Sequence, residues 1–129
     1  MIEKVNPCHP DKVADRIAGA IVDLAYRTEN DPRIAVEVLI GHGACYVIIE
    51  TSAAIYDEQI SGIVHRIAGK VDVVSNIKPQ DKKLSDNQSN GFRCGDNGIF
   101  KGMPLTEEEK KLSSIAREIY GYYPCDGKY

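Results

Sequence analysis

The feature that most constrains the fold is a stretch of alternating residues that turns back on itself. Apolar side chains occupy every second position from residue 34 to residue 40, which is the period of a strand with one buried face. Gly41-His42-Gly43 then supplies a turn, and the apolar residues 45–49 return. Together these features predict an antiparallel hairpin.

Three other segments have the spacing of amphipathic helices. The first begins at Pro10, which suits a first helical position and places His9 at or beside the N-cap. The second covers about 56–68, and the third opens with Thr106-x-x-Glu109, a capping-box pattern. Apolar residues recur three or four positions apart in each helix: Val13, Ile17, Ile21 and Leu24, then Ile60, Ile63, Val64 and Ile67, and finally Leu112, Ile115, Ala116 and Ile119.

A third strand at 71–77 completes the order helix, hairpin, helix, strand, long polar segment and helix. That order predicts an α+β fold: a small mixed or antiparallel sheet, made of the hairpin plus a third strand, with helices packed on one face. A sheet of three strands is thin and its edges need cover. The residues after Gly121 suggest no closing element, so we expect a partner surface.

Composition narrows the classes of function. The chain has 129 residues, enough for one compact domain, and its net charge of −3 argues against a basic nucleic-acid-binding surface. No apolar run reaches the length of about eighteen residues that a membrane span needs, and Met1-Ile2-Glu3-Lys4 begins no signal peptide. We therefore expect a cytoplasmic protein that has neither nucleic acid nor a membrane as its partner.

Polar residues that could carry chemistry lie at the start of the first helix. His9-Pro10-Asp11-Lys12 stands where a helix N-terminus presents free N–H groups, which favours phosphate binding. Asp11 could hold Mg²⁺ together with phosphate oxygens. An acid in the first turn is also ordinary capping chemistry, and the local pattern alone favours that interpretation.

Acidic residues also interrupt the predicted strands. Glu37 lies on the face shared by Ala35 and Leu39, where a carboxylate must be solvated, paired or bound to a cation. Glu50 closes the second strand, at an element end where site residues are often found. Both positions also suit residues that simply face solvent.

Two glycine-containing stretches follow in the second half of the chain. Residues 91–98 carry Asp96, which could accept a hydrogen bond from an ammonium group, although Asp-Asn-Gly is also good turn chemistry. Near the end, Asp126-Gly127-Lys128 is either a turn or a lysine directed at phosphates.

In this order the motifs resemble those of methionine adenosyltransferases, the S-adenosylmethionine synthetases. By this resemblance, residues 1–103 are similar to the N-terminal domain of the family, and residues 104–129 to the start of its central domain. Six matches carry the resemblance: Glu3 through Cys8-His9-Pro10-Asp11-Lys12-Val13-Ala14-Asp15, Ala35-Val36-Glu37, Glu50-Thr51-Ser52-Ala53, Gln80 after the third strand, Arg93-Cys94-Gly95-Asp96-Asn97-Gly98, and Cys125-Asp126-Gly127-Lys128.

The resemblance implies a reaction of ATP with L-methionine that gives S-adenosylmethionine and releases pyrophosphate and phosphate. The departing triphosphate develops strong negative charge, so cations and hydrogen-bond donors should dominate catalysis. The site residues implied are His9 and Lys128 for catalysis, His9, Asp126 and Lys128 for ATP, Glu50, Gln80 and Asp96 for methionine, Asp11 for Mg²⁺, Glu37 for K⁺, and Glu3 in support.

The resemblance also bears on partners. The family's active site forms between two subunits, and its members continue through two further repeats after the motif that contains Lys128. We therefore expect the chain to carry the N-terminal part of the site, and to form a homodimer or to pair with another synthetase chain. Departures from the family pattern occur at Pro7, Cys8, Cys94 and Asn97. The alternative is a non-catalytic module that binds a nucleotide or pairs with a synthetase subunit.

Overall fold

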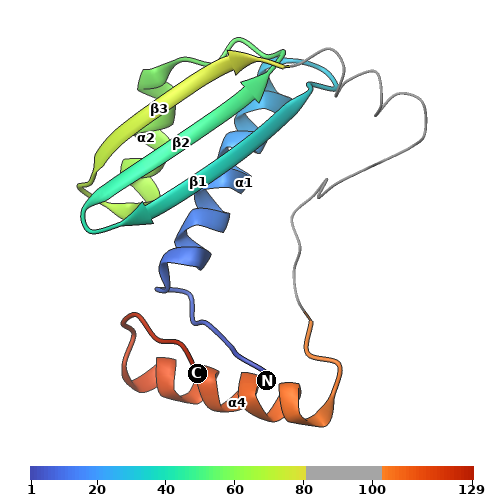
Figure 1. Cartoon of the computed structure of the whole chain (residues 1–129), viewed down its shortest axis with the longest axis vertical. Coiled ribbons are helices and arrows are strands. Elements are labelled where there is room, and N and C mark those ends of the chain that lie inside the picture. Colours follow the sequence, from blue (N-terminus) through green and yellow to red (C-terminus); the bar gives the residue numbers. More distant parts are fainter. Residues whose placement is uncertain (81–102) are drawn as a thin grey trace.

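The computed structural model describes residues 1–80 and 103–129. Figure 1 shows a single sheet with two helices behind it and a third helix set apart from it. This arrangement confirms the predicted α+β class. In chain order the elements are α1 (Pro10–Thr28), β1 (Ile34–Gly41), β2 (Ala44–Thr51), α2 (Asp57–Ala68), β3 (Asp72–Pro79) and α4 (Glu107–Tyr122).

The sheet is mixed. Its strands lie in the order β1-β2-β3, with β1 and β2 antiparallel and β2 and β3 parallel. His42 and Gly43 form a two-residue turn, and both have positive φ angles, 50° and 78°. Such a turn matches the twist of the flanking strands, and glycine adopts a positive φ without steric cost. The predicted hairpin is confirmed, although Gly41 belongs to β1 and not to the turn.

One face of the sheet carries the hydrophobic core. Helices α1 and α2 cover this face, as predicted, and their apolar stripes meet alternate side chains of β2. Each large apolar side chain that is fully buried contributes about 1.5–3 kcal/mol to stability. The most deeply buried residues are Ile17, Ile21, Ala25, Cys45, Val47, Ile49, Ile60 and Val64. Among the described helices, none combines the length and the apolar character that a membrane crossing requires.

No described helix covers the opposite face of the sheet. Leu39, Tyr46 and Val74 are register neighbours across the three strands, and 71%, 53% and 53% of their respective surfaces are exposed. Ile48 lies in the next row and is 55% exposed. We call these four residues the outer patch. Glu37 pairs with Ile48 on the same face, as the alternation in β1 predicted.

Helix α4 lies against the N-terminal segment and not against the sheet (Figure 1). Its predicted capping box is present, because Thr106 Oγ1 accepts from the Glu109 N–H at 3.2 Å and the Glu109 carboxylate accepts from the Thr106 N–H at 3.0 Å. Ser113 and Ala116 are its buried residues. The prediction that Ile115 lies in the buried stripe is wrong, because the N-terminal segment packs on the side of the small residues and leaves Ile115 exposed.

The tail after α4 has a partner, which corrects the expectation that the chain ends without a closing element. Lys4 and Tyr129 exchange two backbone hydrogen bonds of 2.8 Å each, and the Asn6 N–H donates to the Gly127 carbonyl at 3.0 Å. Val5 and Lys128 form an antiparallel bridge between these bonds. Side-chain patterns did not indicate this pairing, because it is made by backbone groups.

Candidate functional site

His9 caps the N-terminus of α1. His9 Nδ1 accepts a hydrogen bond from the Asp11 N–H at 3.2 Å. Because Nδ1 is the acceptor here, a neutral ring carries its proton on Nε2, which can donate to a ligand oxygen. The Asp11 carboxylate is 3.7 Å from Nδ1, beyond hydrogen-bond distance, and its side chain is 76% exposed.

Asn6 connects the N-terminus of α1 to the tail that follows α4. It is 3% exposed, its Nδ2 donates to the Cys125 carbonyl at 2.7 Å, and its Oδ1 accepts from the Cys8 N–H at 3.0 Å. Its backbone carbonyl accepts from the His9 N–H at 3.1 Å. Both ends of the side chain and the backbone are therefore engaged, and the tail is held beside His9.

The tail brings Lys128 to the N-terminal segment. Lys128 Nζ lies 3.0 Å from Glu3 Oε2, and both side chains are about half-exposed. An exposed pair of this kind contributes at most about 1 kcal/mol, so a phosphate could replace Glu3 as the partner of Lys128. A Cβ added at Gly127 would lie 2.7 Å from Asn6 Nδ2, so the close approach of the tail depends on glycine.

Five of the residues that the sequence singled out lie at the start of α1, in the N-terminal segment or in the tail that pairs with this segment. We call them the front group: Glu3, His9, Asp11, Asp126 and Lys128. Asp126 belongs to it through its neighbour Gly127, which is bonded to Asn6, and its own side chain is exposed. The front group combines three acids, a lysine and an imidazole, and His9 and Asp11 stand at the N-terminus of α1.

Three other candidate residues, the sheet group, lie in or beside the sheet: Glu37, Glu50 and Gln80. Glu50 pairs with Ala35, two residues before Glu37, so the two acids are diagonal neighbours roughly 7–8 Å apart on the outer face. Gln80 follows β3 directly. Its Oε1 atom is buried and has no hydrogen-bond partner within the part of the chain that the structure describes. A buried acceptor without a donor costs about 1–3 kcal/mol, which a donor on a ligand would recover.

Helix α1 separates the two groups. It has 19 residues and is therefore about 28 Å long at 1.5 Å per residue. His9 caps its N-terminus, whereas Glu29 at its other end accepts a hydrogen bond from the Ser52 hydroxyl at 3.2 Å, two residues after Glu50. Figure 1 shows the N-terminal end of α1 extending away from the sheet. One copy of the chain thus keeps the front group and the sheet group apart, and Asp96 lies outside the described residues.

The candidate cation ligands among the described residues are separate carboxylates and not a cluster. Across 1–80 and 103–129, no three His, Cys, Asp or Glu side chains gather where they could hold a metal ion. Asp11 fits the mode in which one carboxylate and substrate phosphates share Mg²⁺. Glu37, with Glu50 as its diagonal neighbour, fits a cation held by oxygen ligands on the outer face.

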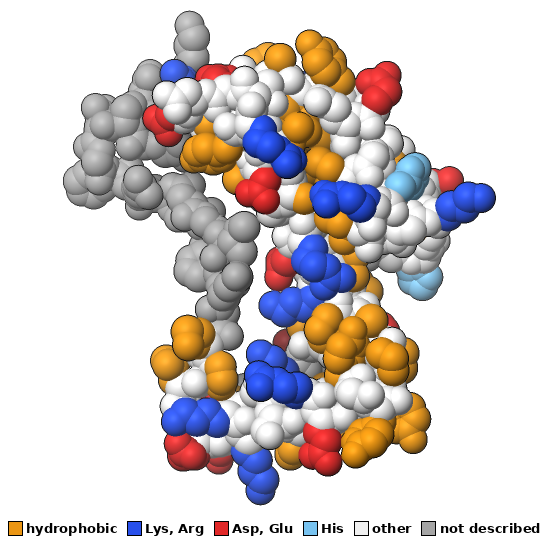
Figure 2. Space-filling view, turned by 180° about the vertical axis from the view of Figure 1, so that it is seen from behind, with side chains coloured by type: hydrophobic (Ala, Val, Ile, Leu, Met, Phe, Trp, Pro, Cys, Tyr) orange, Lys and Arg blue, Asp and Glu red, His pale blue; other side chains and the backbone are white. Residues whose placement is uncertain are grey.

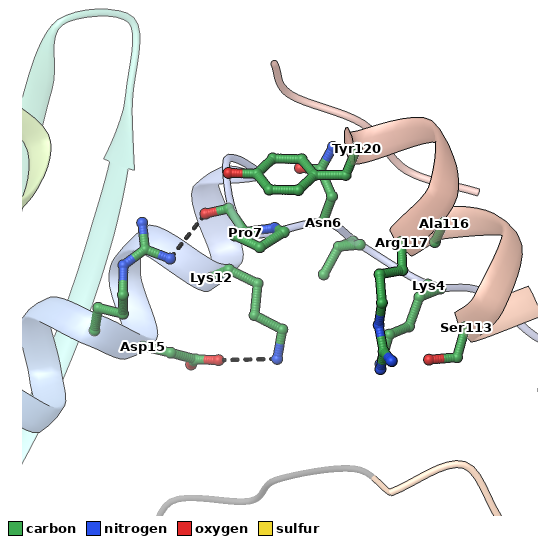
Figure 3. Close-up of a pocket in the computed structure, with 11 residues that line it drawn as sticks. Lys4, Asn6, Pro7, Lys12, Asp15, Ser113, Ala116, Arg117 and Tyr120 are labelled. Carbon is green, nitrogen blue, oxygen red and sulfur yellow. Dashed lines mark hydrogen bonds and ion pairs between the residues drawn. The ribbon is translucent and has the colours of Figure 1, made fainter. Parts of the chain in front are cut away.

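The sequence analysis missed a group of basic residues between α1 and α4. Lys12 and Arg16, one turn apart on α1, line a cleft with Arg117 of α4 and Lys4 of the N-terminal segment (Figure 3). The spacing of Lys12 and Arg16 is visible in the sequence. The placement of α4 beside them is not, because it depends on the pairing of the tail.

Comparisons with known proteins agree with the fold. Residues 1–88 match the S-adenosylmethionine synthetase N-terminal domain. The S-adenosylmethionine synthase of Wolinella succinogenes is 30% identical over 125 residues, covering 83% of this chain and 32% of that protein. The synthase of Sulfurovum sp. (strain NBC37-1) is 29% identical over 138 residues, covering 91% and 35%. The chain belongs to the S-adenosylmethionine synthetase family, and it spans about a third of the length of these relatives.

A solved structure supports the fold separately. The unusual S-adenosylmethionine synthetase from Campylobacter jejuni matches with a TM-score of 0.54 at 23% identity, covering 64% of this chain and 26% of that chain. At this identity the match shows that the two chains share a fold.

Proposed function

We propose that this chain takes part in the synthesis of S-adenosylmethionine from ATP and L-methionine, with release of pyrophosphate and phosphate, and that it supplies the N-terminal part of the site. The observation that carries the proposal is the front group. His9 and Asp11 stand at the N-terminus of α1, and the tail that carries Lys128 pairs with the segment that leads into this helix, which supports the proposal. Such an end favours a polyanionic leaving group.

The chemistry proposed for the front group is electrostatic. His9 Nε2–H would donate to an oxygen of the departing triphosphate, since its Nδ1 is already engaged by the Asp11 N–H. Lys128 would exchange Glu3 for a phosphate oxygen, with Asp126 beside it. Asp11 would hold Mg²⁺, which when bound would neutralise charge on the phosphates. No covalent intermediate is required.

The sheet group would bind methionine. The carboxylate of Glu50 and the Oε1 atom of Gln80, which has no partner among the described residues, can both accept from an ammonium group, which is the cationic end of the amino acid. Glu37 would hold K⁺ on the same face, where the cation would balance the two neighbouring carboxylates. Asp96 stays a prediction as a third methionine ligand.

We further propose that two chains complete each site, as a homodimer or with another synthetase chain. The separation of the front group from the sheet group by the length of α1 supports this, because one copy cannot bring both groups to one substrate pair. The outer patch supports it too, since four adjacent exposed apolar residues suit a protein contact. The patch equally favours the alternative, a pairing module without catalysis.

The test is a chromatographic assay of the purified chain with ATP, methionine, Mg²⁺ and K⁺. Formation of S-adenosylmethionine with pyrophosphate and phosphate would support catalysis by the chain itself. The variants His9→Ala and Glu50→Ala should each be inactive while keeping the fold, as measured by circular dichroism. Mixed together, they should recover about a quarter of the activity, because half of a random mixture is heterodimer with one intact site of two.

Other outcomes would discriminate between catalysis by the chain and a pairing module without catalysis. If neither variant loses activity, the proposed roles of His9 and Glu50 are wrong. If the unmodified chain forms no product but co-sediments with a full-length synthetase, the pairing module is favoured. Calorimetry with ATP then tests the front group directly, since His9→Ala should weaken ATP binding and Glu50→Ala should not.

A further inference from the structure

A cleft of about 530 Å³ lies between α1, α4 and the N-terminal segment, and no role proposed above uses it. Val5, Pro7 and Ala116 give it apolar walls, while Ser113 and Tyr120 add hydroxyl groups from α4. Its volume is that of a small-molecule site. The side chains of His9, Asp11 and Lys128 do not line it, so it is distinct from the front group.

The cleft concentrates positive charge in an acidic chain. Among the described residues, four cations line it, Lys4, Lys12, Arg16 and Arg117, against one acid, Asp15, whereas the whole chain carries −3. Figure 2 shows Lys and Arg side chains gathered where α4 faces the rest of the molecule. Like charges brought this close repel one another, and a bound anion would relieve that repulsion.

The cations differ in how they are held. The Arg16 guanidinium donates to the Pro7 carbonyl at 2.8 Å, and Lys12 Nζ lies 3.5 Å from Asp15 Oδ2. Lys4 and Arg117 have no ion-pair or hydrogen-bond partner for their side chains among the described residues. In Figure 3, Lys4, Lys12, Arg117 and Ser113 extend toward the same side of the cleft. Within the part of the chain that the structure describes, the cleft therefore has two cations held by protein partners and two, Lys4 and Arg117, that have none.

We propose that this cleft binds a small anion that carries two or more phosphate groups. The Arg117 guanidinium can pair with two phosphate oxygens at once, Lys4 and Lys12 add point charges from the N-terminal segment and from α1, and the Ser113 hydroxyl can also donate. A single phosphate or carboxylate would engage one wall of the cleft. A polyphosphate can reach the N-terminal segment, α1 and α4 together.

The experiment is a titration of the full chain with inorganic pyrophosphate in the absence of Mg²⁺. Calorimetry measures the affinity, and amide chemical shifts locate the binding site. Arg117→Ala and Lys4→Ala should each weaken binding about tenfold or more, since each removes a charged hydrogen-bond donor. Lys111→Ala is the matched control, because it removes the same charge from the exposed side of α4 outside the cleft. It should change binding less than about twofold.

The outcomes are distinct. Shifts confined to residues around Ser113, Arg117 and Lys12, with binding unchanged in His9→Ala, would support the cleft. Equal weakening by Lys111→Ala would overturn the proposal in favour of diffuse charge. Loss of binding in His9→Ala but not in Arg117→Ala would assign the anion to the front group and overturn it as well. Citrate binding as tightly as pyrophosphate would overturn the preference for phosphate.

Discussion

At the scale of single residues, Asn6 has the largest consequence for the candidate site. Two of its hydrogen bonds join the N-terminal segment to Cys125 and Gly127 in the tail, and two more bind the amides of Cys8 and His9. Because the side chain is buried, each hydrogen bond that is lost would leave a polar group with neither a protein partner nor water. The placement of the tail, and of Lys128 with it, therefore depends on a residue that carries none of the proposed chemistry.

Asn6→Asp should release the tail. The substitution removes the Nδ2 donor and places a carboxylate against the Cys125 carbonyl, at a cost of about 1–3 kcal/mol or more. Hydrogen exchange of the Lys4, Asn6 and Tyr129 amides should accelerate by at least about tenfold, because these amides are paired across the tail. Asn76→Asp, on the exposed face of β3, is the control and should leave these amides unchanged. Unchanged exchange in Asn6→Asp would contradict this account of the tail.

At the scale of elements, α4 is defined by its cap more than by its packing. It contributes two buried side chains, both small, so the hydrogen bonds at its N-terminus have a large share in fixing where it begins. Backbone N–H groups of Thr106 and Leu105 donate to the Glu109 carboxylate, and they lower its pKa. Since donors favour the charged form, the cap is coupled to pH.

The first turn of α4 should loosen in acid. A carboxylate whose pKa is lowered in the folded state stabilises that state above its unfolded pKa of about 4.3, and this stabilisation is lost as the pH falls through the folded pKa. Amide shifts of Leu105 and Thr106, followed from pH 6 to about pH 3, should report the loss. Glu109→Gln should remove this transition. A transition of equal size in Glu109→Gln would assign it to other acids.

At the scale of the whole molecule, the chain presents a covered face and an uncovered face of one thin sheet. The outer patch exposes Leu39, Tyr46, Ile48 and Val74 in adjacent register positions, where each strand places a large apolar side chain in solvent. An apolar cluster of this kind marks a protein contact on a soluble domain. The same face carries Glu37 and Glu50, so a contact there would enclose part of the sheet group.

Tyr46→Glu should therefore reduce self-association. A charge at the centre of the outer patch would have to be buried without a partner in any dimer formed by this face. Sedimentation velocity should show a shift to the monomer, while Tyr26→Glu, at a similarly exposed tyrosine on α1, should leave the association unchanged. A dimer that persists in Tyr46→Glu would place the contact elsewhere.

The elements with a clear period could be predicted, and so could part of the site. The strand alternation, the capping box at Thr106 and the helix beginning at Pro10 are local properties, and each is present in the structure. His9 was placed correctly as a cap for the same reason. Ile115 was misplaced because its burial depends on which side of α4 the N-terminal segment covers, a choice that helical spacing does not encode.

The sequence by itself determined the α+β class, the hairpin and the order of the family motifs, because these depend on the periodicity of side chains and on capping within a few residues. The tertiary structure decided the pairing of the tail with residues 4–6, the contact of Lys128 with Glu3, and the cleft between α1 and α4. It also decided that the front group and the sheet group lie at opposite ends of α1. These features rest on backbone hydrogen bonds and contacts between distant segments, which leave no periodic signal in the chain.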